Sequence, residues 1–222
     1  LEMGVKSKII QIGNPIDLEK WKFTEDKRKQ GRSLIRIPEG QKVVLGVGQL
    51  QKRKGVEDFI EIAKNHPDLQ FVWVGSRPFG LITEGVRRIN HKIETAPANV
   101  HFVGQFEYEQ MPAIYAAADI FVFPSYQENS PLAPIEAAAT GLPVIYRDLK
   151  EYELLYQSTY LKAKTNEDFS RLIQEMTSNS AFLEDAKQIS ARLTQQFDKE
   201  IIREKLISLY QSLYLKGGKS RK

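Results

Sequence analysis

Two glutamates lie on either side of a predicted helix start in the middle of the chain. Glu128 belongs to the polar loop before this helix, and Glu136 lies about one turn inside it. Pro131 has no N–H group, so the amides of Leu132 and Ala133 are the backbone donors left at the helix end. A helix N-terminus attracts anions, and carboxylates beside it can bind hydroxyl groups. The pattern fits a site for a diphosphate flanked by hydroxyls, and it fits equally well a capped helix with solvated glutamates.

A second loop combines glycines with cations. It runs from Gly48 and Gln49 to Gly55 and contains three consecutive basic residues at 52–54. Glycines permit tight turns, and cations beside a helix N-terminus favour an anionic ligand. The loop is neither the G-x-G-x-x-G fingerprint of dinucleotide-binding folds nor a P-loop. Alone, it is as compatible with a solvated basic turn as with a phosphate site.

Short apolar runs predict the framework that positions both loops. The runs are nearly continuous and rich in β-branched and aromatic residues, as expected for parallel strands covered on both faces. They lie at 43–47, 71–74, 100–103, 120–123, 143–145 and 159–161. We therefore expect an α/β fold with a doubly wound, Rossmann-like parallel sheet. Both loops leave strands of this sheet at their carboxyl ends, where such folds bind ligands.

The segments between the apolar runs have helical periodicity. Their apolar stripes predict helices from Val56 to Ala63, at 85–94, at 109–117, and from Pro131 to a stop at Gly141. Asn129 or Ser130 is expected to cap the last of these helices, with Pro131 at its first position, where proline is tolerated.

The pattern divides the chain into three parts. Residues 1–40 form a lead-in with a short strand at 8–12 and a turn at 13–15, and residues 41–165 form the Rossmann-like domain. Residues 166–222 form a helical C-terminal appendage, with stripes at 166–176, 182–197 and 199–215. These helices must pack on this sheet or on a neighbouring domain.

Composition narrows the class of protein and of site. No apolar run approaches the ~20 residues of a membrane-spanning helix, and we expect no signal peptide. The chain has no cysteine, and His66, His91 and His101 lack the spacing of metal ligands, so no metal site is expected.

The net charge of +4 is modest, but basic residues cluster at 27–29, 52–54, 87–88 and 216–222. These clusters fit a solvated surface, phosphate binding or an anionic membrane. Nucleic acid is disfavoured, because no aromatic-rich binding motif accompanies them.

The loop and helix around the two glutamates resemble the signature of family 4 retaining glycosyltransferases. The pattern Pro-Ser-x3-Glu, then seven residues, then Glu-Ala-x-Ala-x-Gly-Leu-Pro-Val-Ile is supplied by Pro124, Ser125, Glu128, Glu136, Ala137, Ala139, Gly141, Leu142, Pro143, Val144 and Ile145. The loop with Gly48, Gln49, Lys54 and Gly55 is similar to the G-R-x4-K-G motif of the same family. Segment 14–17 is similar to the hinge between the two domains of these enzymes. Further similarities at 71–75, 99–104 and 118–120 extend the resemblance over nearly the whole chain.

The resemblance implies that this chain is the C-terminal, nucleotide-sugar-binding half of a GT-B enzyme, with 1–40 as the hinge and lead-in. Glu128 would bind hydroxyls of the transferred sugar, and Glu136 those of the ribose. Lys54 and the amides of Leu132 and Ala133 would hold the diphosphate and stabilise it as the leaving group.

The resemblance also implies that the backbone around Val103, Gly104 and Gln105 contacts the base, and that Gly48 and Gln49 border the diphosphate. No cofactor is implied, because cations and a helix end neutralise the departing diphosphate without a metal. Retention in this family is thought to proceed by front-face attack through an oxocarbenium-like state, without an established covalent nucleophile.

Two positions depart from the family pattern. Gln49 replaces the usual arginine, which is a second cation for the diphosphate, and Arg53 is the candidate that would supply the missing charge. Segment 129–131 replaces the usual Gly-Phe-Gly, and its proline removes one amide donor. Gln49, Arg53 and segments 126–129 and 146–148 look most like bacterial glycolipid synthases, which transfer glucose or galactose to diacylglycerol or a glycosyl-diacylglycerol.

The expected function is therefore hexosyl transfer from UDP-glucose or a related UDP-sugar to a lipid or glycolipid. The acceptor would bind the other GT-B half, so this chain alone should bind donor without transferring it. A cytoplasmic location would suit this role, with the protein in peripheral contact with the anionic inner face of the cell membrane. Two alternatives stay open: a non-catalytic partner- or glycan-binding module, and an oxidoreductase domain, which lacks its glycine fingerprint here.

Overall fold

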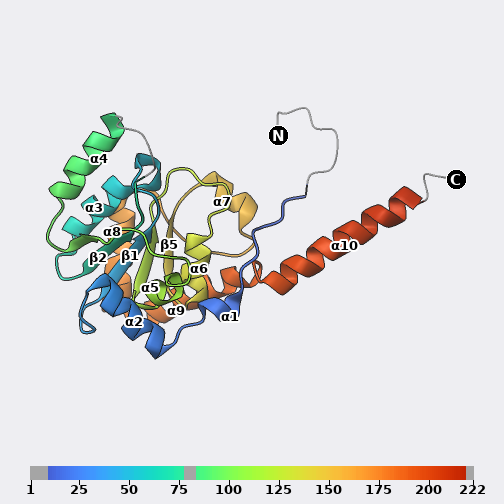
Figure 1. Ribbon diagram of the computed structural model, residues 1–222, viewed down its shortest axis with the longest axis horizontal. Helices are drawn as coiled ribbons and strands as arrows, with labels where there is room; N and C mark the ends of the chain where they lie inside the picture. The colour runs from blue at the N-terminus through green and yellow to red at the C-terminus, as the bar shows by residue number, and fades with distance from the viewer. Residues whose placement is uncertain (1–9, 78–83, 219–222) are drawn as a thin grey trace.

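Six parallel strands form one sheet at the centre of the protein (Figure 1). The computed structural model describes residues 10–77 and 84–218, and its strand order is β3-β2-β1-β4-β5-β6. The strands are β1 (Val43–Val47), β2 (Gln70–Val74), β3 (Val100–Phe102), β4 (Ile120–Phe123), β5 (Val144–Arg147) and β6 (Leu161–Ala163). This is the predicted Rossmann-like sheet. Its last two strands begin later than the apolar runs predicted at 143–145 and 159–161, and they end later, because backbone pairing continues to Arg147 and Ala163.

Alternate side chains of each strand enter two separate apolar cores. Val43 and Leu45 lie in one core and Val44 lies in the other, all at most 1% exposed. Helices that contribute to the first core are α1 (Leu18–Trp21), α2 (Glu25–Ile35), α5 (Met111–Ala116), α6 (Ala133–Ala139) and α7 (Lys150–Leu155). The second core contains α3 (Val56–Lys64) and α8 (Asn166–Ser178), and α9 (Ser180–Gln195) contributes to both. Crossover helices on both faces explain why the strands are apolar throughout.

The strand order reverses between β1 and β4. Val44 and Leu45 of β1 pair with Ile120 and Phe121 of β4, although the two strands are distant in sequence. Because both strands point the same way, the loops that leave them meet at one edge of the sheet. That edge is the topological switch point, where folds of this class bind ligands.

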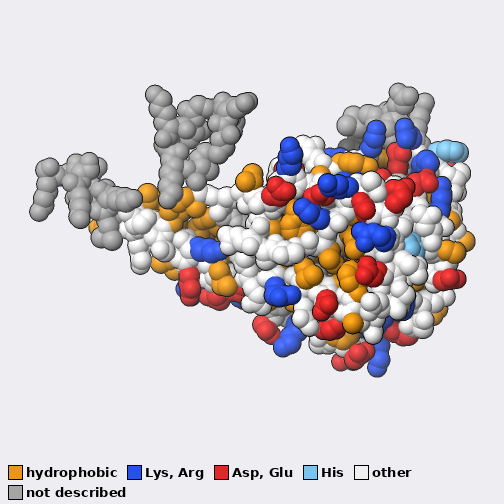
Figure 2. Space-filling view, turned by 180° about the vertical axis from the view of Figure 1, so that it is seen from behind, with side chains coloured by type: hydrophobic (Ala, Val, Ile, Leu, Met, Phe, Trp, Pro, Cys, Tyr) orange, Lys and Arg blue, Asp and Glu red, His pale blue; other side chains and the backbone are white. Residues whose placement is uncertain are grey.

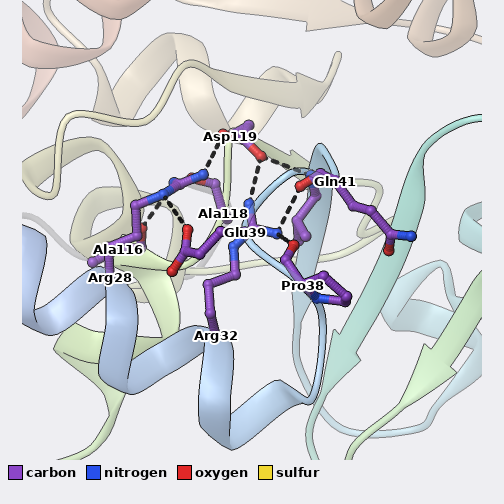
Figure 3. A network of polar contacts seen from close by, with 9 residues as sticks. Arg28, Arg32, Pro38, Glu39, Gln41, Ala116, Ala118 and Asp119 are labelled. Atoms are coloured by element: carbon purple, nitrogen blue, oxygen red, sulfur yellow. Dashed lines mark hydrogen bonds and ion pairs between the residues drawn. The ribbon is translucent and has the colours of Figure 1, made fainter.

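A polar network at the opposite edge ties α2 to the start of β4 (Figure 3). Arg28 and Arg32 donate to the two carboxylate oxygens of Asp119 at 3.0 and 2.9 Å. Asp119 also accepts the amide of Val43 at 2.7 Å. Arg32 is 3% exposed, and burial lowers its pKa while Asp119 opposes that shift. The network fixes the amino ends of β1 and β4, far along the strands from the two loops.

The lead-in lies beside the short segment that joins α9 to the last helix, α10, which spans Lys199–Gly218. Ile16 forms a parallel bridge with Asp198, and Lys199 Nζ contacts Asp17 Oδ2 at 2.7 Å. The strand predicted at 8–12 is wrong for residues 10–12, which have no regular structure, and residues 8 and 9 lie outside the described part.

Helix α10 extends away from the body of the molecule (Figure 1). Figure 2 shows apolar side chains along this projection, and Tyr210, Leu213 and Tyr214 are 68%, 56% and 84% exposed. Among residues 10–77 and 84–218, no helix has both the length and the apolar character needed to cross a bilayer.

Candidate functional site

The loops after β1 and β4 are bonded to each other at the switch point. The carbonyl of Arg53 accepts the hydroxyl of Ser125 at 3.0 Å and the amide of Tyr126 at 2.8 Å. Gly55 has a φ of +74°, and a Cβ there would lie 2.3 Å from the carbonyl oxygen of Pro124. Only glycine allows this approach, so the G at the end of the basic loop serves loop contact as well as turn geometry.

An ion pair lies where the loops meet. Lys54 Nζ is 2.5 Å from Glu128 Oε1, and Ser125 Oγ donates to the same oxygen at 2.6 Å. Both partners are largely buried, with side-chain exposures of 16% for Lys54 and 8% for Glu128. The pair borders a hollow of about 430 Å³ lined by Arg53, Lys54, Gln127, Glu128, Asn129 and Ser130. The two predicted charges of opposite sign are therefore brought together at one cavity.

The helix after this loop begins later than the sequence predicts. Helix α6 starts at Ala133, and Leu132 occupies the cap position without a side-chain cap bond. Neither Asn129 nor Ser130 caps it, and Pro131 lies outside it, so those predictions are wrong. Ser130 instead accepts the side-chain amide of Asn14 through its carbonyl and its hydroxyl, at 3.3 and 3.1 Å. That contact joins residues 116 positions apart in sequence, and it binds Ser130 to Asn14 instead of to the amides of the helix end.

The free backbone donors at this helix start are nevertheless those expected. The amides of Leu132 and Ala133 donate to no described residue, whereas those of Ile135 and Glu136 bond to the carbonyl of Leu132 at 2.9 Å. Leu132 is 41% exposed, so the helix end is open to a ligand. Free N–H groups at a helix N-terminus favour an anion.

Glu136 occupies a second, separate polar position. It is 8% exposed, and Tyr115 donates its hydroxyl to Glu136 Oε2 at 2.9 Å. Burial raises the pKa of Glu136, and the bond from Tyr115 and the charge of Lys20 partly offset this. Burial, the charge of Glu136 and the bond to it raise the pKa of Tyr115 well above its usual value. One carboxylate oxygen of Glu136 is thus held by the hydroxyl of Tyr115.

Three loop glycines complete the edge of the sheet. The carbonyl of Gly48 accepts Trp73 Nε1 at 2.8 Å, and the amide of Gly75 donates to the carbonyl of Gly104 at 2.7 Å. A Cβ at Gly104 would meet no atom within 4 Å, so its backbone faces open space. Val103 and Gln105 flank it, with Gln105 Oε1 accepting from Ser76 Oγ at 2.8 Å. The predicted base-contacting segment is therefore bonded to Gly75, which in turn packs against Gly48 of the loop after β1.

Gln49, which replaces the usual arginine, and Arg53, the candidate for the missing charge, are both exposed. Arg53 lines the hollow beside Lys54, and its Nε donates to Gln51 at 2.8 Å. Gln49 is not among the lining residues. Of the candidate cations, the structure therefore brings Arg53 and Lys54 to the hollow. The described residues contain no group of three or more His, Cys, Asp or Glu side chains arranged to hold a metal.

Sequence reasoning assigned no role to three contributors: Ser125, Tyr115 and Arg147. Ser125 carried a signal, because it stands three positions before Glu128 in the recognised motif. Arg147 lies in segment 146–148 of the resemblance, but its role, like that of Tyr115, depends on a contact between distant elements that the sequence does not show.

With the geometry described, the family can be stated. The family described as "Glycosyl transferases group 1" matches residues 27–196. The chain belongs to this family. The resemblance seen in the motifs, to family 4 glycosyltransferases, is thereby confirmed.

Two relatives of this chain act on lipids, by their names. It is 31% identical over 215 residues to alpha-galactosylglucosyldiacylglycerol synthase of Streptococcus pneumoniae, covering 96% of this chain and 58% of that protein. It is 32% identical over 174 residues to processive diacylglycerol alpha-glucosyltransferase of Acholeplasma laidlawii, covering 78% and 52%. The chain therefore spans little more than half the length of these relatives.

Solved structures agree on the fold. Sucrose-phosphate synthase from Thermosynechococcus elongatus matches with a TM-score of 0.77 and 27% identity, over 92% of this chain and 52% of that chain. Anabaena HepE in complex with UDP-glucose matches with a TM-score of 0.77 and 19% identity, over 90% and 57%. The expected fold class, the Rossmann-like half of a GT-B glycosyltransferase, is confirmed.

Proposed function

We propose that this chain is the donor-binding half of a retaining, metal-independent hexosyltransferase that uses a UDP-sugar. The observation that carries the proposal is the Lys54–Glu128 pair beside the open helix start of α6. A cation and two free amides suit a diphosphate, and a carboxylate next to them suits sugar hydroxyls. UDP-glucose is the first donor to test, since HepE, which shares the fold, binds it.

Each site residue has a role in this proposal. Lys54 and the amides of Leu132 and Ala133 hold the diphosphate, and Glu128 binds hydroxyls of the hexose. Glu136, oriented by Tyr115, binds the ribose hydroxyls.

The remaining site residues complete the binding of the nucleotide. The backbone at 103–105 contacts the base, and Gly48 and Gln49 border the phosphates. Arg53 supplies the second cation that the family usually draws from the position of Gln49.

The chemistry is stabilisation of a leaving group. As the bond from the anomeric carbon to the diphosphate breaks, negative charge develops on the diphosphate and positive charge on the sugar ring. Fixed donors aimed at that developing charge lower the barrier. Lys54, Arg53 and the α6 amides act on the diphosphate, so no divalent metal is required. The acceptor hydroxyl attacks from the face that the diphosphate leaves and gives its proton to the departing diphosphate, which retains the anomeric configuration.

The acceptor in this proposal is a lipid or glycolipid that binds the other half of the enzyme. Both named relatives are diacylglycerol glycosyltransferases or synthases, and the apolar side chains exposed on α10 suit packing against a second half. Peripheral contact with the inner face of the cell membrane belongs to the same proposal. This chain alone is expected to bind donor and to transfer little or no sugar.

Calorimetric titration of the chain with UDP, UDP-glucose, UDP-galactose and the matching GDP- and ADP-sugars, all in EDTA, tests this function. Lys54→Ala and Lys52→Ala form a matched pair, because both lysines lie in the same short 3-10 turn and only Lys54 contacts Glu128. We expect Lys54→Ala to weaken UDP about tenfold or more, the usual loss for a charge-assisted hydrogen bond, and Lys52→Ala to have little effect. Absence of binding to every nucleotide would favour a non-catalytic module instead.

A further inference from the structure

A buried arginine holds the loop that carries Glu128. Arg147 is the last residue of β5 and is 5% exposed. Its Nε donates to the carbonyl of Pro124 at 2.8 Å and its Nη1 to that of Lys164 at 3.2 Å. Charged side chains are rarely buried this fully, and apolar residues often fill such a space with no loss of stability. The burial of this cation therefore calls for a reason beyond packing.

Arg147 forms a closed triangle with Tyr126 and Asp58. The guanidinium lies 4.0 Å from the centroid of the Tyr126 ring, and the Tyr126 hydroxyl donates to Asp58 Oδ1 at 3.0 Å. The other carboxylate oxygen of Asp58 is 3.6 Å from Arg147 Nη2. The triangle joins β5, the loop after β4 and helix α3.

The triangle grips both sides of Ser125. The carbonyl of Pro124 accepts a hydrogen bond from Arg147, and the ring of Tyr126 stacks on the Arg147 guanidinium. Arg147 therefore holds the residue on each side of Ser125. Ser125 in turn donates to Glu128 Oε1. The amide of Tyr126 also donates to the carbonyl of Arg53, which precedes Lys54. The guanidinium thus holds the loop that carries Glu128 directly, and it is linked to the segment that carries Lys54 through the amide of Tyr126.

We propose that Arg147 is a positioning residue for the sugar end of the site. By holding the loop at Pro124 and Tyr126, it sets where the Glu128 carboxylate lies relative to Lys54. It thereby determines how much more tightly the site binds an intact sugar nucleotide than the free nucleotide. This inference rests on the proposed function, and the contacts of Arg147 add to it a determinant that touches neither the sugar nor the diphosphate.

A second buried arginine provides the control. Arg32 is 3% exposed and bonded to Asp119 and to backbone carbonyls at the opposite edge of the sheet (Figure 3). Arg32→Lys and Arg147→Lys both remove part of a buried guanidinium network, so both should lower stability. Only the second lies against the loop of Glu128.

The test is calorimetric titration of the wild-type chain, Arg147→Lys and Arg32→Lys with UDP and with UDP-glucose. The readout is the ratio of the two dissociation constants, which a general loss of stability does not move. We expect Arg147→Lys to lower the preference for UDP-glucose about tenfold, as loss of a charged hydrogen bond does, and Arg32→Lys to leave the preference within about twofold. Tyr126→Ala should lower it in the same direction, and since Tyr126 is 50% exposed, this variant serves if Arg147→Lys does not fold.

A preference kept by both Arg147→Lys and Tyr126→Ala would overturn the inference and leave the proposed function standing. An equal loss in Arg32→Lys would also overturn it, because the preference would then not depend on a contact with the loop that carries Glu128. A wild-type chain that binds neither UDP nor UDP-glucose would overturn the proposed function and this inference with it.

Discussion

Glu128 and Glu136 have the same charge but different neighbours. Glu128 is neutralised by Lys54 and bonded by Ser125 at the rim of a hollow. Glu136 lies in the first turn of α6, with Tyr115 as its bonded partner and a raised pKa. Different surroundings for two like groups allow different tasks, which suits the proposed roles of Glu128 in sugar binding and of Glu136 in ribose binding.

The two tasks predict separable effects on binding. Glu136→Ala should weaken UDP and UDP-glucose alike by ~1–3 kcal/mol, as expected when a charged hydrogen-bond partner is lost. Glu128→Gln should weaken UDP-glucose, because Glu128 is the residue proposed to bind the hexose hydroxyls. It should not weaken UDP, which has no hexose, because Lys54 stays free to bind the diphosphate. Calorimetric titration of both ligands into both variants measures this. Parallel losses in the two variants would show that the assignments are wrong.

The raised pKa of Glu136 predicts a pH dependence of stability. A carboxyl whose pKa is higher in the folded chain binds protons more tightly there, so its contribution to stability falls as the pH rises from the unfolded pKa through the raised folded one. Glu136→Gln removes this loss and keeps an oxygen for the Tyr115 hydroxyl. We expect the variant to be at least as stable as wild type at pH 7, with the difference shrinking below about pH 4, where the wild-type carboxyl is protonated in both states. Urea unfolding at the two pH values decides this. A variant clearly less stable at pH 7 would contradict it.

At the scale of elements, the contact between the two loops depends on Gly55. Its φ of +74° and the 2.3 Å that would separate a Cβ from the Pro124 carbonyl oxygen leave no room for alanine. Gly141, which follows α6, is the matched control, with a φ of +90° and nothing within 4 Å of its Cβ position. We expect Gly141→Ala to cost about 1 kcal/mol for the backbone conformation alone, and Gly55→Ala roughly 3 kcal/mol because steric overlap is added. Urea unfolding of both variants compares them, and equal costs would mean that the loops are not in tight contact.

The elements also show what the sequence could reveal. Strands were predictable because residues buried on both faces leave continuous apolar runs, and the meeting of the loops after β1 and β4 followed from the general rule for switch points. The start of α6 was not, because Asn14 holds Ser130 from a distant part of the chain. The bonds from Tyr115 to Glu136 and from Arg147 to Pro124 could not be predicted for the same reason. Periodicity reports local burial and carries no record of which distant side chains meet.

At the scale of the whole molecule, the described chain has two features suited to a partner half. The lead-in and the segment before α10 are bonded side by side through Ile16 and Asp198. Helix α10 leaves the body of the molecule (Figure 1), and several of its apolar side chains are exposed. A helix that is apolar on more than one side is normally covered. In the proposed function the donor is bound by the loops of this half, so the chain can be tested alone.

The proposal that the intact domain binds UDP without metal predicts a metal-independent gain in stability. A ligand that binds only the folded state at about 100 times its dissociation constant stabilises that state by about 2.7 kcal/mol. For a chain of this size, each kcal/mol raises the melting temperature by about 2–4 °C, so UDP should raise it by roughly 5–10 °C. The cations and helix amides that neutralise the diphosphate belong to the protein, so we expect the same rise in EDTA and in magnesium. Thermal unfolding followed by circular dichroism measures it, with Lys54→Ala as the variant in which a given UDP concentration should give a smaller rise. A rise that vanishes on chelation would show that a divalent cation, and not Lys54 with the α6 amides, holds the diphosphate.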